Sequence, residues 1–275
     1  MKDNDEKKAG LRLILNNLAT STPPTVEETI AYAREKHSGQ TDHNGKPYAK
    51  HPIRTAQNVL LLAPDASEDV IKAALLHDVI EDCDDVDENT LKALGYSEET
   101  LEILKLVNRP PNDRRPYAKV IDELIAAGNQ GAMLVKLADT LDNLNVHRMA
   151  KVRASDPQKA ERLTKKYEHA VEKLSTALNI DPDICKTIAE KDVKMEEDFT
   201  GEKYFVFDGN PVKTIWDEGI IEEVYIKETN GALTRNDGLA FYIETEVSEK
   251  DAISKETFEK LSTNKGFGVQ HSNME

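Results

Sequence analysis

Residues able to do chemistry gather in the stretch Ala73–Asp82, AALLHDVIED, where an apolar run leads into a His-Asp doublet and two acids follow. Residues four positions apart share one face of a helix, so His77 would lie over Glu81. Asp78 would lie over Asp82 in the same way. A neutral imidazole beside a carboxylate supplies two metal ligands, and the second acidic pair would lie within reach of a water held by the metal. The pattern therefore indicates a metal site at which water is activated.

The rest of a ligand set must come from other parts of the chain, because a lone His-Asp doublet is more commonly a charged helix end at the surface. The chain offers His51 ahead of the doublet and Asp139 after it. In a helix, Asp139 and Asn143 share one face. Asp142 lies beside Asn143, so one of the two acids could be plain surface charge.

Length and composition limit the class of protein. With 275 residues, 39% of them hydrophobic, the chain can form one large domain or a domain with a smaller module. No apolar run is long enough to span a bilayer, and the charged stretch MKDNDEKKAG followed by LRLILNNL does not fit a signal peptide. Cys83 and Cys185 lie far apart without a CxxC spacing, which suits reduced thiols. These features predict a cytoplasmic protein.

The formal net charge of −15 argues against a nucleic-acid groove, since such a groove needs a basic stripe to release counterions. It also disfavours an anionic membrane as a partner. A small polyanionic substrate would need local positive charge and a metal to overcome the overall field. Local basic groups occur at Arg109, Arg114, Arg115, Lys136, Arg148, Lys151 and Arg153.

Caps, prolines and apolar spacing predict a mainly helical architecture before residue 200. Helices are expected over 25–36, 52–62, 67–82, 97–107, 117–127 and 157–178, from Asp181-Pro182 onward, and across the stripe Leu134, Leu137, Leu141 and Leu144. Thr25 with Glu28 reads as a capping box, and Ser67 caps the helix that carries the His-Asp doublet. The segment Asn108–Pro116, NRPPNDRRP, is predicted to be a loop because three prolines interrupt it.

After about Gly201 apolar and polar residues alternate, as in half-buried strands. Strands are predicted at Lys203–Phe207, Glu222–Glu228 and Leu239–Val247, with a hairpin turn at Asn230-Gly231. The only tryptophan, Trp216, is expected to anchor the core of this module, and residues 248–275 to form a short helix and a tail. The predicted organisation is a lead-in over 1–24 with a short helix at Leu11–Leu18, a helical domain over 25–180, a connecting helix over 181–200 and a strand-rich module over 201–275.

Residues 26–178 resemble the HD-domain hydrolases of the RelA/SpoT type, most closely the small stand-alone alarmone hydrolases. The segments that carry the resemblance are HSGQ and GKPYAKHP within His37–Pro52, AALLHDVIED, and VKLADTLDNL at Val135–Leu144. The resemblance implies a mainly α HD-domain helical bundle, here with a small C-terminal β-rich extension. It also implies one divalent ion, usually Mn²⁺, bound by His51, His77, Asp78 and Asp139.

The reaction that the resemblance implies is hydrolysis of the 3′-pyrophosphate of (p)ppGpp, the alarmone of the stringent response, to GDP or GTP and pyrophosphate. Such an ion leaves positions for water and a phosphate oxygen and lowers the pKa of the water. Glu81 and Asp82 match the acids that position and activate that water, and Asn143 matches a residue facing the substrate ribose or phosphate. Candidates for further substrate contacts are Lys136, Arg109, Arg148 and Tyr48.

The sequence departs from the family where an arginine usually stacks on the guanine, because it has Thr41-Asp42-His43 there. Asp42 cannot stack as a guanidinium does, although it could accept from the guanine N1–H, and His43 could stack. The base specificity is therefore open. The alternatives are the same fold acting on another nucleotide (removing a phosphate from NADPH or cleaving an adenine alarmone), or a nucleotide sensor without catalysis. Intact Glu81 and Asp82 argue against a sensor.

The C-terminal residues 179–275 are too few for a synthetase domain and lack a basic, glycine-rich nucleotide site. We expect hydrolysis without synthesis. The strand-rich module could cover the site, brace the core or join two subunits, so a homo-oligomer is one possible assembly.

Overall fold

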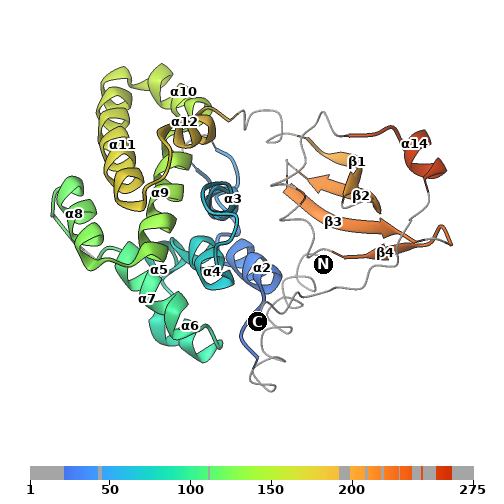
Figure 1. Cartoon of the computed structure of the whole chain (residues 1–275), viewed down its shortest axis with the longest axis horizontal. Coiled ribbons are helices and arrows are strands. Elements are labelled where there is room, and N and C mark those ends of the chain that lie inside the picture. Colours follow the sequence, from blue (N-terminus) through green and yellow to red (C-terminus); the bar gives the residue numbers. More distant parts are fainter. Residues whose placement is uncertain are drawn as a thin grey trace. The chain divides into compact units, whose positions relative to one another are not determined.

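The chain divides into two compact units, Met1–Val193 and Lys194–Glu275. The first consists of helices, whereas the second holds a small antiparallel sheet (Figure 1). This confirms the predicted mainly α fold with a β-rich extension. The limits predicted for the individual domains stay a prediction. The computed structural model describes residues 22–42, 45–110, 112–191, 199–207, 210–217, 220–228, 230–236, 243 and 252–261.

The helices of the first unit are α2 (Val26–Lys36), α3 (Lys50–Leu62), α4 (Glu68–Leu76), α5 (Val79–Asp82), α6 (Glu88–Ala93), α7 (Glu98–Val107), α8 (Tyr117–Ala127), α9 (Gln130–Leu144), α10 (Val146–Ser155), α11 (Pro157–Leu178) and α12 (Pro182–Glu190). Local signals fix several ends as predicted. Thr25 and Glu28 form the capping box of α2, and Ser67 caps α4 through the amide of Val70. Gly128, with a φ of 73°, ends α8 in the left-handed conformation that glycine tolerates.

The single helix predicted from Ser67 to Asp82 is wrong. Helix α4 ends at Leu76, His77 and Asp78 form a turn, and α5 begins at Val79. His77 Nε2 and Asp78 Oδ2 lie 3.1 Å apart at this junction between the two helices.

Helix α9 is the centre of the first unit, in contact with α3, α4, α7, α8, α10, α11 and α12 (Figure 1). Its leucines Leu134, Leu137 and Leu141 are buried, as the predicted apolar stripe requires. The same helix carries two buried carboxylates, Asp139 and Asp142, which are 6% and 3% exposed. Carboxylates are seldom buried unless they are paired or bind a metal, so α9 marks the place to look for a site.

The second unit is a four-stranded antiparallel sheet in the order β1 (Gly201–Phe207), β2 (Asn210–Asp217), β3 (Ile220–Lys227) and β4 (Leu233–Arg235). Its core includes Trp216, which is buried as expected, with Phe205, Val212, Ile221, Val224 and Ile243. The short helix α14 (Lys255–Lys260) packs on the sheet, where the rings of Phe258 and Tyr204 lie 4.9 Å apart.

Two of the predicted strands are present as β1 and β3, and the hairpin turn at Asn230-Gly231 joins β3 to β4. The sequence reading missed β2, which contains Pro211, a residue that counts against a strand. It also missed α6 and β4. The helix predicted at Leu11–Leu18 lies outside the described residues, and so does the strand predicted at Leu239–Val247 except for Ile243. Among the described residues, the search for a helix of membrane-spanning length and hydropathy found none.

Candidate active site

Two histidines from different elements direct the same ring atom into one cluster. His51, in the first turn of α3, has Nδ1 2.6 Å from Asp142 Oδ2, and His77, just after α4, has Nδ1 2.8 Å from the carbonyl oxygen of Ala74. In each pair Nδ1–H donates, which leaves the Nε2 lone pair free to bind a metal. His77 Nε2 is buried and makes no hydrogen bond to any described residue, as expected of a ligand atom.

Two carboxylates complete the cluster. His51 Nε2 lies 3.4 Å from Asp78 Oδ2 and 3.4 Å from Asp139 Oδ1. His77 Nε2 lies 3.1 Å and 3.7 Å from the same two oxygens. Metal–ligand bonds of about 2.0–2.2 Å keep neighbouring donor atoms about 3.0–3.5 Å apart. His51, His77 and Asp139 therefore form a group that could hold one divalent ion, and the carboxylate of Asp78, the fourth predicted ligand, lies beside both imidazoles.

The electrostatics of this cluster favour a cation. Burial opposes the charged form of His51, but the carboxylates of Asp139, Asp142 and Asp78 outweigh it and raise its pKa to about 9. Burial likewise opposes the charged form of Asp78, and His77 and His51 hold its pKa well below its usual range. The carboxylates stay ionised in a buried place and require positive charge. A divalent ion supplies that charge when the imidazoles are neutral.

Asp142 is not plain surface charge, the alternative that the sequence left open for one of the two acids. It is 3% exposed and accepts from Arg54 Nε at 2.7 Å as well as from His51. Arg148 donates to the same carboxylate. Burial would raise the pKa of Asp142, but Arg148 and Arg54 hold it well below its usual range. Asp142 is therefore a fixed anion that holds His51 in one tautomer and orientation.

Arg54 was not among the residues predicted from the sequence, and Arg148 was predicted in a different role. A signal for Arg54 was available, because it follows His51 by three positions and so lies on the same face of α3. Arg148 was predicted to contact substrate phosphate. In the structure its guanidinium lies against Asp142 and is largely buried, with 12% of the side chain exposed. In the structure Arg148 thus holds Asp142, the carboxylate that accepts from His51.

The two predicted water-activating acids, Glu81 and Asp82, follow Asp78 by three and four positions and are both exposed. Glu81 Oε1 accepts from the backbone N–H of Arg109 at 2.6 Å. Partial loss of solvent around the carboxylate raises the pKa of Glu81, although the bond to Arg109 acts in the opposite direction. Burial and the charge of Asp78 also raise the pKa of Asp82. A carboxylate with a raised pKa is a better proton acceptor, which suits a general base.

Three of the predicted substrate contacts lie against the cluster. Tyr48 donates to Asp78 Oδ2 at 2.7 Å. Lys136 Nζ lies 2.9 Å from Asp139 Oδ2, and Asn143 Nδ2 lies 2.5 Å from Asp139 Oδ1. Burial would lower the pKa of Lys136, but Asp139 raises it, so the ammonium keeps its charge.

The other predicted substrate contacts are tied to loops. The guanidinium of Arg109 binds Asp113 at 3.2 Å within the 108–116 loop. Asp42 Oδ1 accepts from the backbone N–H of Lys46 at 3.0 Å, which closes a turn. His43 lies outside the described residues.

The loop that contains Gln40 and Asp42 is also connected to the segment after the cluster residue Asp78. Gln40 donates to the carbonyl oxygen of Asp82 at 3.1 Å, and His37 Nδ1 lies 2.8 Å from Gln40 Oε1. The HSGQ segment is therefore fastened to the segment that holds the two exposed acids. His37 braces the loop, as its place in the motif suggests.

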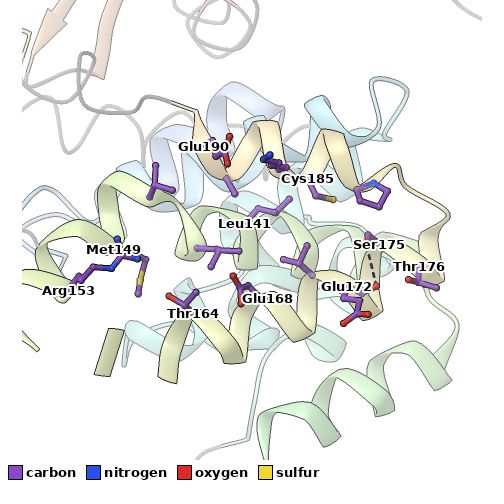
Figure 2. A pocket seen from close by; sticks show the side chains of 16 residues that line it. Leu141, Met149, Arg153, Thr164, Glu168, Glu172, Ser175, Thr176, Cys185 and Glu190 are labelled. Carbon is purple, nitrogen blue, oxygen red and sulfur yellow. Dashed lines mark hydrogen bonds between the residues drawn. The ribbon is translucent and has the colours of Figure 1, made fainter. Parts of the chain in front are cut away.

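A separate cavity of about 470 Å³ lies among α9, α10, α11 and α12 (Figure 2). Leu141 points into it, two positions after Asp139 and so on nearly the opposite side of α9. Its lining is mainly apolar and includes none of the predicted site residues. Titratable groups with shifted pKa values gather at the histidine cluster instead, which makes that cluster the candidate active site.

Comparison with known proteins identifies the family of the helical unit. The HD domain family model matches residues 29–169. A Danio rerio protein named guanosine-3′,5′-bis(diphosphate) 3′-pyrophosphohydrolase MESH1 is 33% identical over 130 residues, which is 45% of this chain and 69% of that protein. The Drosophila melanogaster protein of the same name is 33% identical over 133 residues, 46% of this chain and 72% of that protein.

A bacterial relative is much longer than the matched segment. The guanosine-3′,5′-bis(diphosphate) 3′-pyrophosphohydrolase of Vibrio cholerae is 32% identical over 133 residues, which is 45% of this chain but only 18% of that protein. A solved structure described as a metazoan ortholog of SpoT that hydrolyzes ppGpp is 26% identical, with a TM-score of 0.41 over 60% of this chain and 97% of that chain. By the match over residues 29–169 and the likeness to the MESH1 proteins, this chain belongs to the HD-domain family.

Proposed function

We propose that this protein is a metal-dependent hydrolase that removes the 3′-pyrophosphate of (p)ppGpp and releases GDP or GTP and pyrophosphate. The observation that carries the proposal is the convergence of His51 and His77 with Asp78 and Asp139, with two exposed carboxylates soon after Asp78 in the sequence. The names of the family relatives, which refer to this reaction, support it.

The cofactor we propose is one Mn²⁺ ion held by His51, His77, Asp78 and Asp139. Imidazole and carboxylate ligands in one set suit a divalent ion of this kind, although another divalent metal would satisfy the same donors. When bound, the ion lowers the pKa of water and offsets the negative charge that builds up on the phosphoryl group.

In the proposed reaction the chain's own residues hold the substrate and move a proton. The oxygen of a water bonds to the phosphorus attached to the ribose 3′ oxygen, and the bond between that phosphorus and the 3′ oxygen breaks. Glu81, held by the Arg109 amide, takes the proton of the water. The 3′ oxygen leaves and gains a proton from solvent. Asp82 is the alternative base.

Substrate binding is proposed to use the residues beside the cluster. Lys136 would hold phosphate oxygens by charge-assisted hydrogen bonds, and Asn143 and Tyr48 would contact ribose or phosphate. Asp42 or His43 would contact the base. Since Asp42 stands where an arginine is expected and its carboxylate closes a turn, a nucleotide with another base is the second candidate substrate.

The test is a release assay with Mn²⁺ on a panel of nucleotides: ppGpp, pppGpp, the adenine 3′-pyrophosphate counterpart and NADPH. The proposal predicts pyrophosphate release from the guanine nucleotides. Turnover of the adenine compound or NADPH alone would keep the hydrolase and change its substrate. Tight binding without turnover of any of them would favour a sensor. A cytoplasmic location and the absence of nucleic-acid or membrane partners stay predictions from sequence.

A further inference from the structure

Lys166 on α11 has an unusual environment for a cation. Its Nζ lies 4.3 Å from the centre of the Tyr117 ring and 4.5 Å from that of Tyr167. The two rings meet edge to face, 6.2 Å apart at 85°. Among the residues that the structure describes, Lys166 has no ion pair, whereas its neighbour Lys165 pairs with Glu161 at 2.6 Å. Two phenol rings thus hold a half-buried ammonium that has no counter-charge.

This ammonium lies in the electrostatic reach of the candidate active site. Burial lowers the pKa of Lys166, and the charges of Lys136 and Arg109 lower it further, against the opposing charge of Asp139. A polar contact connects the ring beside Lys166 to helix α9, since the Tyr117 hydroxyl lies 3.3 Å from Oγ1 of Thr140, the residue after Asp139. Lys136 on α9 and Arg109 in the 108–116 loop therefore lie close enough to Lys166 on α11 for their charges to act on it.

The charge balance of this group is incomplete. Lys136 is paired with Asp139 and Arg109 with Asp113. Lys166 has only the faces of two aromatic rings, which attract a cation but supply no formal negative charge. Like charges held near one another repel, so a polyanion placed among them gains more than it would beside one isolated lysine. Of these three cations, Lys166 is therefore the one that has no carboxylate partner among the described residues.

We propose that Lys166 is a substrate-binding residue that contacts a phosphate group of the nucleotide, with Tyr117 and Tyr167 holding its side chain in place. This inference rests on the proposed function and extends it, because (p)ppGpp carries two phosphate arms. Lys166 binds one phosphate arm, and the 3′ and 5′ arms offer it the same chemistry. A fixed ammonium on a phosphate forms a charge-assisted hydrogen bond, the strong kind.

The test compares Lys166→Met with Lys166→Arg. Methionine keeps an apolar side chain on the two rings and removes the charge, whereas arginine keeps the charge. We expect Lys166→Met to raise KM for ppGpp by about 10-fold or more, with kcat within about 2-fold, as for loss of a hydrogen bond to a charged group. Lys166→Arg and the matched control Lys165→Met should stay near the wild-type values.

A second substrate identifies the arm. Guanosine 3′-diphosphate carries no 5′ phosphate and so lacks the 5′ arm. If Lys166 binds the 5′ arm, KM for this compound is insensitive to Lys166→Met; if it binds the 3′ arm, KM rises for both compounds. An unchanged KM for both, or an equal fall of kcat in the methionine and arginine variants, would overturn the inference.

A binding measurement separates this inference from the proposed function. Calorimetric titration with inorganic pyrophosphate should show a weaker affinity in Lys166→Met than in the wild type. If the wild type hydrolyses no (p)ppGpp but binds pyrophosphate through Lys166, the proposed function fails and the anion site stands. If hydrolysis is normal, and Lys166→Met changes neither KM nor the affinity for pyrophosphate, the anion site fails and the function stands.

Discussion

His51 on α3 donates through Nδ1 to Asp142 on α9, at 2.6 Å and across 91 residues of sequence. The bond fixes which nitrogen of the imidazole faces the cluster. Arg54 and Arg148 hold the Asp142 carboxylate from behind. The orientation of one proposed metal ligand therefore depends on a buried ionic group that is not itself among the proposed ligands.

Removing the charge of this supporting group should weaken metal binding. In Asp142→Asn the amide oxygen can still accept from His51, but it cannot balance the two arginines. We expect Mn²⁺ affinity to fall by about 10–100-fold, the usual cost of losing such a supporting contact. Calorimetric titration with Mn²⁺ measures it, with Asp122→Asn, an exposed aspartate paired with Lys173, as the control. Equal affinities in the two variants would show that Asp142 does not act through His51.

A second variant removes a ligand. Asp78→Ala eliminates the carboxylate that lies 3.4 Å from His51 Nε2 and 3.1 Å from His77 Nε2, so metal binding and activity should be lost together. Metal content and pyrophosphate release are measured on the same preparation, after circular dichroism has confirmed the helical fold. Full metal occupancy in this variant would rule Asp78 out of the ligand set.

Glu81→Gln should separate metal binding from catalysis. The amide keeps the size of the side chain and can accept from the Arg109 amide, but it cannot take a proton. We expect metal content to stay normal and turnover to fall by about 10²–10⁴-fold. The control is Glu98→Gln on α7, an exposed glutamate that pairs with Lys92. A near-normal rate in Glu81→Gln would remove Glu81 from the proposed reaction.

Local sequence signals, such as helix caps and stops, predicted much of the fold. Caps at Thr25 and Ser67 and the stop at Gly128 depend only on neighbouring residues, so they can be read directly. The four metal ligands could be proposed because their short motifs resemble those of a known family. Their closeness in space depends on α9 packing against α3, which no local pattern states.

What the sequence left open depends on long-range contacts. Helix α4 ends at Leu76 although no proline or glycine stands there, so the sequence carried no stop signal. Asp142 looks like surface charge until Arg54, 88 residues away, is seen beside it. Strand β2 is stable despite Pro211 because strands pair with it on both sides. The environment of Lys166 could not be predicted from the sequence, because the two rings that contact it come from two helices, α8 and α11.

Metal affinity should depend on pH, with a sign set by the histidines. Burial opposes the proton on His51, yet the surrounding carboxylates raise its pKa to about 9, so the metal-free imidazole carries a proton below that pH. A metal ion must displace this proton. Affinity for Mn²⁺ should therefore rise about tenfold per pH unit for each proton released, and the His51 contribution should level off above about pH 9. Titrations in buffers of different ionisation enthalpy measure the released protons. A pH-independent affinity with no proton release would contradict this assignment.

The measurement that tests the metal centre most directly is anomalous X-ray diffraction at the manganese edge, from crystals of the full chain grown with Mn²⁺. The account predicts a single strong peak bonded to His51 Nε2, His77 Nε2 and carboxylate oxygens of Asp78 and Asp139. A peak elsewhere in the protein, or none at this cluster with Mn²⁺ in excess, would contradict it.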